Sequence, residues 1–158
     1  MALVKGTNSF VTLLEASDYF SDRLDVAAWT AATDPVKSQA LVTATLLLND
    51  LNWTGLAISD SQPLAFPRSG TYFDPRVGDN VTLPSTVPPR ILQATYELAY
   101  HLLNNDGLLD DSGTVSDLQV SSISLSIKTV ASTIPPVVYR IIKPLLVNAG
   151  TNSWWRAW

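Results

Sequence analysis

The stretch DPVKSQALVTATLLLND, residues 34–50, is the clearest structural element in the sequence. Asp34 suits the N-cap of a helix, and Pro35 suits the first helical position, where a missing amide hydrogen costs no hydrogen bond. Apolar residues then recur three and four positions apart, at Ala40, Leu41, Ala44, Leu47, Leu48 and Leu51. This spacing predicts an amphipathic helix that ends near Asn52.

Helices are also predicted on both sides of this one. Thr12 and Glu15 have the spacing of a capping box, in which each side chain accepts a hydrogen bond from a free amide at a helix start. The sequence predicts further helical segments over residues 13–24, 26–32, 88–103 and 137–146. The region from Leu56 to Pro89 lacks periodicity and holds six of the ten prolines. We therefore expect a long loop there.

The segment from Ser116 to Val130 changes to a period of two. Ile123, Leu125 and Ile127 alternate with polar residues, which predicts a β-strand with one apolar and one Ser-lined face. Leu118 to Val120 could supply a partner strand within the chain; otherwise the partner comes from a neighbouring subunit. We accordingly assign Ile123, Leu125 and Ile127 to a candidate protein interface.

These elements together predict a mainly α fold. It would be a small helical bundle with a long Pro-rich loop, one β-strand or hairpin and an extended C-terminal tail. Residues 1–146 would form the helical domain, including the β segment at 116–130, and residues 147–158 a linker followed by a Trp-rich tail. Because buried Trp and Arg side chains dominate many interfaces, we expect the tail to dock onto a partner through Trp154, Trp155, Arg156 and Trp158. The alternative is that the tail folds back onto its own subunit.

Charge limits the classes of partner. The formal net charge is −4, the pI is about 4.7, and the Lys and Arg residues are scattered singly, which argues against sequence-specific binding of nucleic acid. Charged residues make up 15% of the chain against a usual value of about 25%, so we expect other subunits to cover part of the surface. No stretch reaches the roughly 18 apolar residues of a membrane span. A soluble protein without a membrane partner is expected.

No residue set predicts catalysis. The single histidine, His101, has no positioned nucleophile beside it in the sequence, and the chain contains no cysteine. The acidic turn from Asp106 to Asp117 lacks the spacing of a calcium loop. We therefore expect no enzyme activity, no cofactor and no metal.

The segment Phe66-Pro67-Arg68 is interpreted as a structural loop. Two prolines fix the backbone around a Leu/Phe pair, so the loop can bury apolar side chains beneath the helices. Arg68 would then bind nearby carboxylates or helix-end carbonyls. A ligand site is the alternative.

The order of these segments resembles a protein family of tailed bacteriophages. The opening GTNSFVTLLEASDYFSDRL, residues 6–24, is similar to the family's G-x-x-S-Y-V-t-l-x-e-A-d-x-Y-f start. Its W-x-G and l-a-W-P-R-s-G motifs are matched at residues 53–55 and 64–70, with Phe66 in place of the expected Trp. Its V-P-x-x-i-x-x-A-x-x-E-L-A motif is matched at residues 87–99. The resemblance covers roughly residues 6–103.

Two different functions follow from the resemblance. The family carries a label as DnaT-like single-stranded-DNA-binding proteins, but its members resemble head-to-tail connector or adaptor subunits. The latter implies a homo-oligomeric ring, usually a dodecamer, that binds the portal and tail or further neck proteins. Such a ring is made in the host cytoplasm, lies in the virion neck and contacts packaged DNA passively. The alternative is a single-stranded DNA-binding protein, which needs aromatic side chains interleaved with a basic groove.

Overall fold

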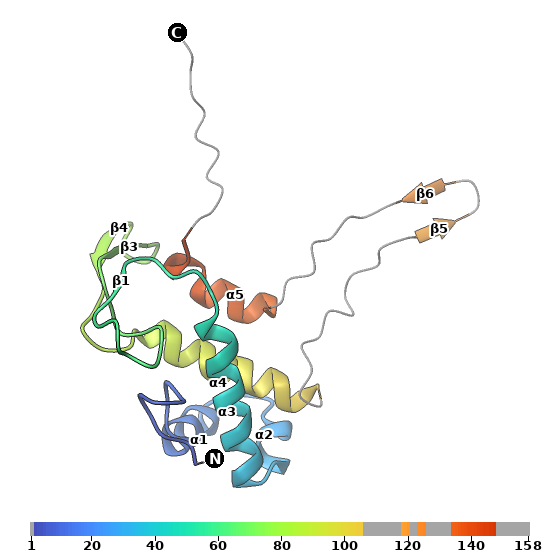
Figure 1. The fold of residues 1–158 in the computed structure, drawn as a ribbon. Helices are drawn as coiled ribbons and strands as arrows, with labels where there is room; N and C mark the ends of the chain where they lie inside the picture. Colours follow the sequence, from blue (N-terminus) through green and yellow to red (C-terminus); the bar gives the residue numbers. More distant parts are fainter. Residues whose placement is uncertain (1, 106–117, 121–122, 126–133, 148–158) are drawn as a thin grey trace.

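The computed structural model describes residues 2–105, 118–120, 123–125 and 134–147 (Figure 1). Two long helices dominate these residues, and shorter helices and strands surround them. The helices are α1 (Leu13–Ser21), α2 (Ala27–Ala31), α3 (Asp34–Asn49), α4 (Pro89–Asn104) and α5 (Pro136–Ile142), followed by the 3-10 helix η1 (Lys143–Leu145). The strands are β1 (Leu56–Ala57), β2 (Arg68–Ser69), β3 (Thr71–Asp74), β4 (Asp79–Thr82), β5 (Leu118–Val120) and β6 (Ile123–Leu125).

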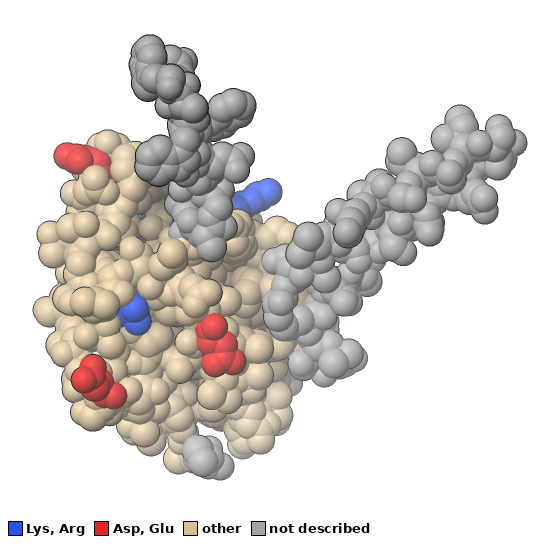
Figure 2. Space-filling view, turned by 45° about the horizontal axis from the view of Figure 1, so that its top comes forward, with Lys and Arg blue, Asp and Glu red and all other residues tan. Residues whose placement is uncertain are grey.

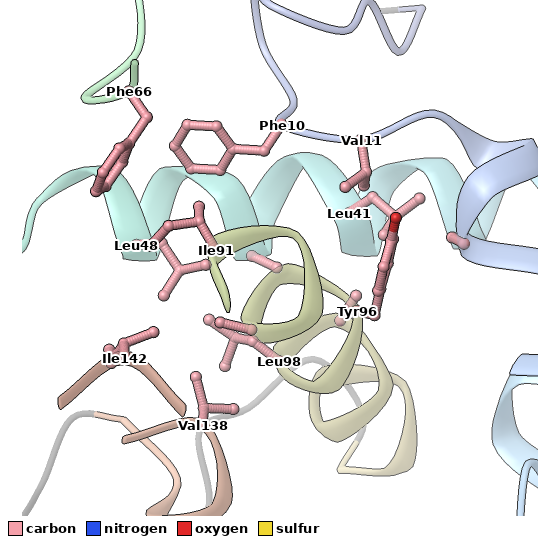
Figure 3. Packing of buried hydrophobic residues seen from close by; sticks show 14 of the residues in the cluster. Phe10, Val11, Leu41, Leu48, Phe66, Ile91, Tyr96, Leu98, Val138 and Ile142 are labelled. Atoms are coloured by element: carbon pink, nitrogen blue, oxygen red, sulfur yellow. The ribbon is translucent and has the colours of Figure 1, made fainter. Parts of the chain in front are cut away.

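The core lies where α4 packs between α3 and α5. Each helix contributes large aliphatic side chains that are almost fully buried (Figure 3): Leu41 and Leu48 from α3, Ile91 and Leu98 from α4, Val138 and Ile142 from α5. Burying one such side chain stabilises a fold by roughly 1.5–3 kcal/mol. The apolar spacing predicted for α3 and α4 therefore forms the centre of the molecule.

The helix starts follow local hydrogen bonding. The predicted capping box is confirmed: the Glu15 amide donates to the Thr12 hydroxyl at 3.1 Å, and the Thr12 amide donates to the Glu15 carboxylate at 2.8 Å. The N-cap of α3 is Thr33 rather than Asp34, which places Asp34 and Pro35 in the first turn. Helix α1 ends at Ser21, short of the predicted Leu24.

The prediction of a mainly α bundle is wrong, because the fold is mixed α/β. The region from Leu56 to Pro89, expected to be a loop, holds two antiparallel pairs, β1 with β2 and β3 with β4. These strands are two to four residues long, too short to show an alternating pattern in the sequence. A third pair, β5 with β6, aligns Val120 with Ile123, which is the within-chain alternative for this segment.

Two glycines allow the chain to approach itself between β1 and β2. Gly55 has a φ of +75°, and a Cβ there would collide with the backbone oxygen of Ser69. Gly70 has a φ of +129° and would place a Cβ 3.0 Å from the Cα of Gly55. The carbonyl of Gly70 accepts the amide hydrogen of Leu83 at 2.9 Å. Both positions therefore require glycine in order to bring β2 onto β1 and start the β3–β4 hairpin.

The segment after α5 is tied back to the residues that follow α3. The Thr54 amide donates to the Leu145 carbonyl at 2.9 Å, and the Val147 amide donates to the Asn52 carbonyl at 3.0 Å. Between them Trp53 and Leu146 form an antiparallel bridge. These bonds join segments more than ninety positions apart and close the described part of the fold.

Several predicted sites fall outside this description. The structure does not describe Ile127 or the tail residues Trp154, Trp155, Arg156 and Trp158, nor the surroundings of the Ile123 and Leu125 side chains. The predicted interface, and the division into a domain of residues 1–146 and a tail of residues 147–158, stay predictions. Among the described residues, no helix has the length and apolarity needed to cross a membrane.

Candidate nucleic-acid interface

An open cavity of about 400 Å³ lies between the β3–β4 hairpin and the N-terminal turn of α4. Side chains from the hairpin and from the helix line it, among them Tyr72, Arg76, Pro84, Pro89 and Arg90. Tyr72 and Asp74 share one face of β3 because side chains of a strand alternate. Phe73 points to the other face and is 55% exposed.

The buried carboxylate of Asp74 holds the cationic groups of this cavity. Arg76 Nη2 donates to Asp74 Oδ2 at 2.7 Å, and Arg90 Nη2 donates to Asp74 Oδ1 at 3.3 Å. The Arg76 amide and the Tyr72 hydroxyl also donate to this carboxylate, at 3.0 and 3.3 Å. The Arg76 guanidinium, followed by its backbone N–H and then by Arg90, holds the pKa of Asp74 well below its usual range. Asp74 is therefore an anion that positions two arginines.

Arg90 links three elements and keeps one donor without a partner. Its Nη1 donates to the Ile141 carbonyl of α5 at 3.3 Å, while its Nη2 reaches Asp74 on β3. Its Nε is buried and has no hydrogen-bond partner within the described residues. A buried N–H that lacks a partner is costly, so this atom marks a place for an acceptor.

The outer face of α5 and η1 lies at the same end of the molecule as this cavity. Strand β3 packs against η1, and Tyr139, Arg140 and Lys143 are exposed on the side away from the core. The charged residues of the hairpin, the first turn of α4, α5 and η1 are four cations and two anions: Arg76, Arg90, Arg140, Lys143, Asp74 and Asp79. Residues 13–34, at the other end in Figure 1, carry one cation and five anions: Arg23, Glu15, Asp18, Asp22, Asp25 and Asp34. The fold thus separates charges that look evenly scattered in the sequence.

On the face that Figure 2 presents, this separation does not create a broad basic surface. Figure 2 shows that uncharged residues form most of the face it presents, and that its Lys, Arg, Asp and Glu side chains stand apart from one another. On that face, attraction for a polyanion would come from a few local contacts rather than from a large field.

The predicted loop residues are used inside the fold. Phe66 is buried, with its ring centroid 6.2 Å from that of Phe10 and 5.1 Å from that of Trp53. The Phe66–Pro67 peptide bond is cis. Arg68 donates to the carbonyls of Thr54 at 2.9 Å and Gly55 at 2.6 Å. These contacts hold the loop on the segment after α3, while Arg68 also lines an open cavity of about 330 Å³ there.

A second buried carboxylate, Glu97, lies midway along α4. It accepts hydrogen bonds from the Tyr19 hydroxyl at 2.6 Å and from Arg23 at 2.9 Å. The Arg23 guanidinium carbon lies 4.4 Å from the ring centroid of Tyr100. His101 lines a small cavity of about 190 Å³ beside this network. Among the described residues, no three His, Cys, Asp or Glu side chains are grouped so as to hold a metal ion.

Sequence reasoning missed the cavity on the hairpin. Tyr72, Arg76 and Arg90 lie in or next to the region predicted to be a loop, and nothing in the sequence pairs them with Asp74. One signal was available: Tyr72 and Asp74 stand two positions apart before the turn PRVG at residues 75–78. That pattern indicates a short strand that places a tyrosine and a carboxylate on one face.

Comparison with known families corrects the assignment made from resemblance. The family model described as "Putative DnaT-like ssDNA binding protein" matches residues 2–157. That description names single-stranded DNA binding and not a head-to-tail connector, so the connector assignment is wrong. The location in the virion neck stays a prediction. No curated protein and no solved structure matches the chain. Because the match spans nearly the whole chain, the protein belongs to this DnaT-like family.

Proposed function

We propose that this protein binds single-stranded DNA at the end formed by the β3–β4 hairpin, the start of α4 and α5. The observation that carries the proposal is that Tyr72, Arg76 and Arg90 line one open cavity. Proteins that bind single strands combine cations along the backbone with aromatic rings that stack on bases. The description of the family supports the same activity.

The exposed residues next to the cavity extend this surface. Tyr139 is 44% exposed, and Lys143 follows it four residues later, so both lie on the outer side of the same helical segment. Arg140 stands beside them and is also exposed. A strand leaving the cavity would find two cations and an aromatic ring along α5.

The acidic composition predicts modest affinity that depends on salt. A single strand releases roughly 0.7 counterion for each phosphate that a cation neutralises. With four cations at this end and a net charge of −4 for the chain, we expect binding to be measurable at low salt and weak near physiological salt. Binding without catalysis is proposed, so the oligonucleotide should stay intact.

The direct test is fluorescence anisotropy of a labelled oligo(dT) at about 50 mM salt. The double variant Arg140→Gln/Lys143→Gln should weaken binding by about tenfold, as expected when one or two phosphate contacts are lost. The matched control is Lys5→Gln/Lys37→Gln, which changes the net charge equally at the opposite end and should leave affinity unchanged. Equal weakening by both variants would indicate a non-specific charge effect. Failure of the wild-type protein to bind any single strand at low salt would overturn the proposal.

A further inference from the structure

We propose that the cavity between the β3–β4 hairpin and α4 holds one nucleotide of the bound strand, with an internal phosphodiester on Arg76 and Arg90 and the unstacked base against Tyr72. This inference rests on the proposed function and assigns its specific binding site. It does not depend on the outer face of α5.

The cationic cluster matches the charge of one phosphodiester. Arg76 and Arg90 share a single counter-charge, Asp74, so the cluster keeps a formal charge of +1. A phosphodiester linkage carries one negative charge, whereas a terminal phosphate carries close to two near neutral pH. The cluster is therefore better matched to a linkage inside a strand than to a free mononucleotide.

The guanidinium groups of Arg76 and Arg90 keep N–H donors that are not all hydrogen-bonded within the described residues. The side chain of Arg76 is 73% exposed even while it contacts Asp74, so its guanidinium can reach a ligand without unfolding the hairpin. The buried Nε of Arg90 has no partner among the described residues. A phosphate oxygen accepts hydrogen bonds from guanidinium groups in the forked geometry that arginine favours. Arg90 also lines the cavity, and a shift of its side chain on binding would give its buried Nε an acceptor.

The rest of the lining suits a base. Tyr72 is half-buried, and Pro84 and Pro89 add apolar surface to the cavity wall. The cavity volume of about 400 Å³ lies at the lower end of the roughly 300–1,000 Å³ typical of ligand pockets. Such a space is large enough for a single base. A base enters only after it leaves its stack, which costs little in a single strand and more in a duplex. This difference in cost favours single strands over a duplex at the cavity.

The test compares two probes of equal charge, labelled oligo(dT) and an abasic oligonucleotide of the same length. We expect the wild-type protein to prefer oligo(dT). Tyr72→Leu should remove that preference by lowering affinity for oligo(dT) to the abasic level. Arg76→Gln should lower the affinity for both probes by about tenfold. Lys5→Gln, an exposed cation distant from the cavity, is the matched control. Thermal melts should confirm that each variant is folded.

A spectroscopic readout keeps the test independent of protein stability. In the wild-type protein, the ¹⁵Nε–¹Hε signal of Arg90 should shift on addition of oligo(dT) and should shift much less with thymidine monophosphate. An unperturbed Arg90 signal, with wild-type affinity in Arg76→Gln and Tyr72→Leu, would overturn the cavity assignment while oligonucleotide binding stands. Equal wild-type affinity for both probes would overturn the base contact. No binding of either probe would overturn the proposed function itself.

Discussion

Asp74 and Glu97 are both buried carboxylates that bind arginine, yet their surroundings differ. Glu97 is enclosed: its side chain is 9% exposed, and its partner Arg23 lies against the ring of Tyr100. The Asp74 side chain is only 2% exposed, but its partner Arg76 extends into solvent, and the Arg90 Nε has no partner among the described residues. The Glu97 network joins α1 to α4, whereas the Asp74 network lies at the edge of an open cavity.

The difference shows that the partners of a buried charge, more than the charge itself, separate a structural network from a binding site. Where the partners of the carboxylate are mostly enclosed by the fold, as around Glu97, removal of one member leaves buried groups without partners and lowers stability. Where donors stay accessible, as around Asp74, removal of one arginine should lower affinity for an anion more than it lowers stability. Each prediction below separates the two networks by one measurement.

The largest effect is expected at Glu97. Glu97→Ala leaves the Tyr19 hydroxyl and Arg23 without their shared acceptor, and we expect the free energy of unfolding to fall by about 3 kcal/mol. Urea denaturation measures it, with Asp60→Ala as an exposed control that should change stability by less than about 0.5 kcal/mol. Affinity of the folded variant for oligo(dT) should stay at the wild-type value. A loss as small as that of the control would show that the network is not structural.

Alkaline pH should weaken the end of the fold that contains Glu97. Burial, together with the hydrogen bond to Glu97, raises the pKa of Tyr19 to about 12, and burial raises that of Tyr96 to about 12 as well. Because an unfolded tyrosine titrates near 10, the stability from these groups is complete below about pH 10 and is lost as pH rises towards 12. Unfolding measured from pH 9 to 12 should show this loss. Tyr19→Phe should make it shallower, and an unchanged slope would contradict the assignment.

Acid should weaken the Asp74 network instead. Its folded-state pKa lies below the ordinary value of 3.8 because Arg76 and Arg90 favour the charged form. Its stabilising effect is therefore complete above that ordinary value and is lost as pH falls below it. Urea denaturation from pH 6 to pH 3 should show a steeper loss in the wild-type protein than in Asp74→Asn. Parallel curves would mean that Asp74 contributes no pH-dependent stability.

The smallest expected effect is a change in the salt dependence of DNA binding. A plot of log affinity for oligo(dT) against log salt should become shallower by about 0.7 in Arg76→Gln, which is the contribution of one single-strand phosphate contact. Glu97→Ala should leave the slope unchanged, since its arginine partner lies away from the proposed site. Titrations at four salt concentrations would measure both slopes. Identical slopes for Arg76→Gln and the wild-type protein would place the phosphate contacts elsewhere.

The sequence predicts the parts of this fold that depend on local pattern. The capping box at Thr12 and Glu15 and the apolar stripes of α3 and α4 are short-range signals, and the structure contains them. The strands between Leu56 and Pro89 were missed because two to four residues carry no period and their pairing depends on Gly55 and Gly70.

The candidate site could not be predicted for a related reason. Arg76 and Arg90 are fourteen positions apart, and Arg140 lies fifty positions further on, so their proximity exists only after α4 packs against α5 and the hairpin. The total charge also gave no sign of a binding site for DNA. A net charge of −4 is an average over the chain, and at one end of the molecule cations outnumber anions. The connector assignment failed differently: it added a biological role that the matched motifs did not contain.

The hydrogen bonds between residues 52–54 and 145–147 have a consequence for the order of folding. Contacts between distant positions require closure of a long loop, and the chain loses conformational entropy before these contacts stabilise it. We infer that α3 and α4 dock first and that the strand-like pairing of Trp53 with Leu146 forms after the rate-limiting step. Substitutions that weaken these hydrogen bonds should then accelerate unfolding and leave the folding rate nearly unchanged. These hydrogen bonds would then set the unfolding rate, and so the lifetime of the native state, rather than the folding rate.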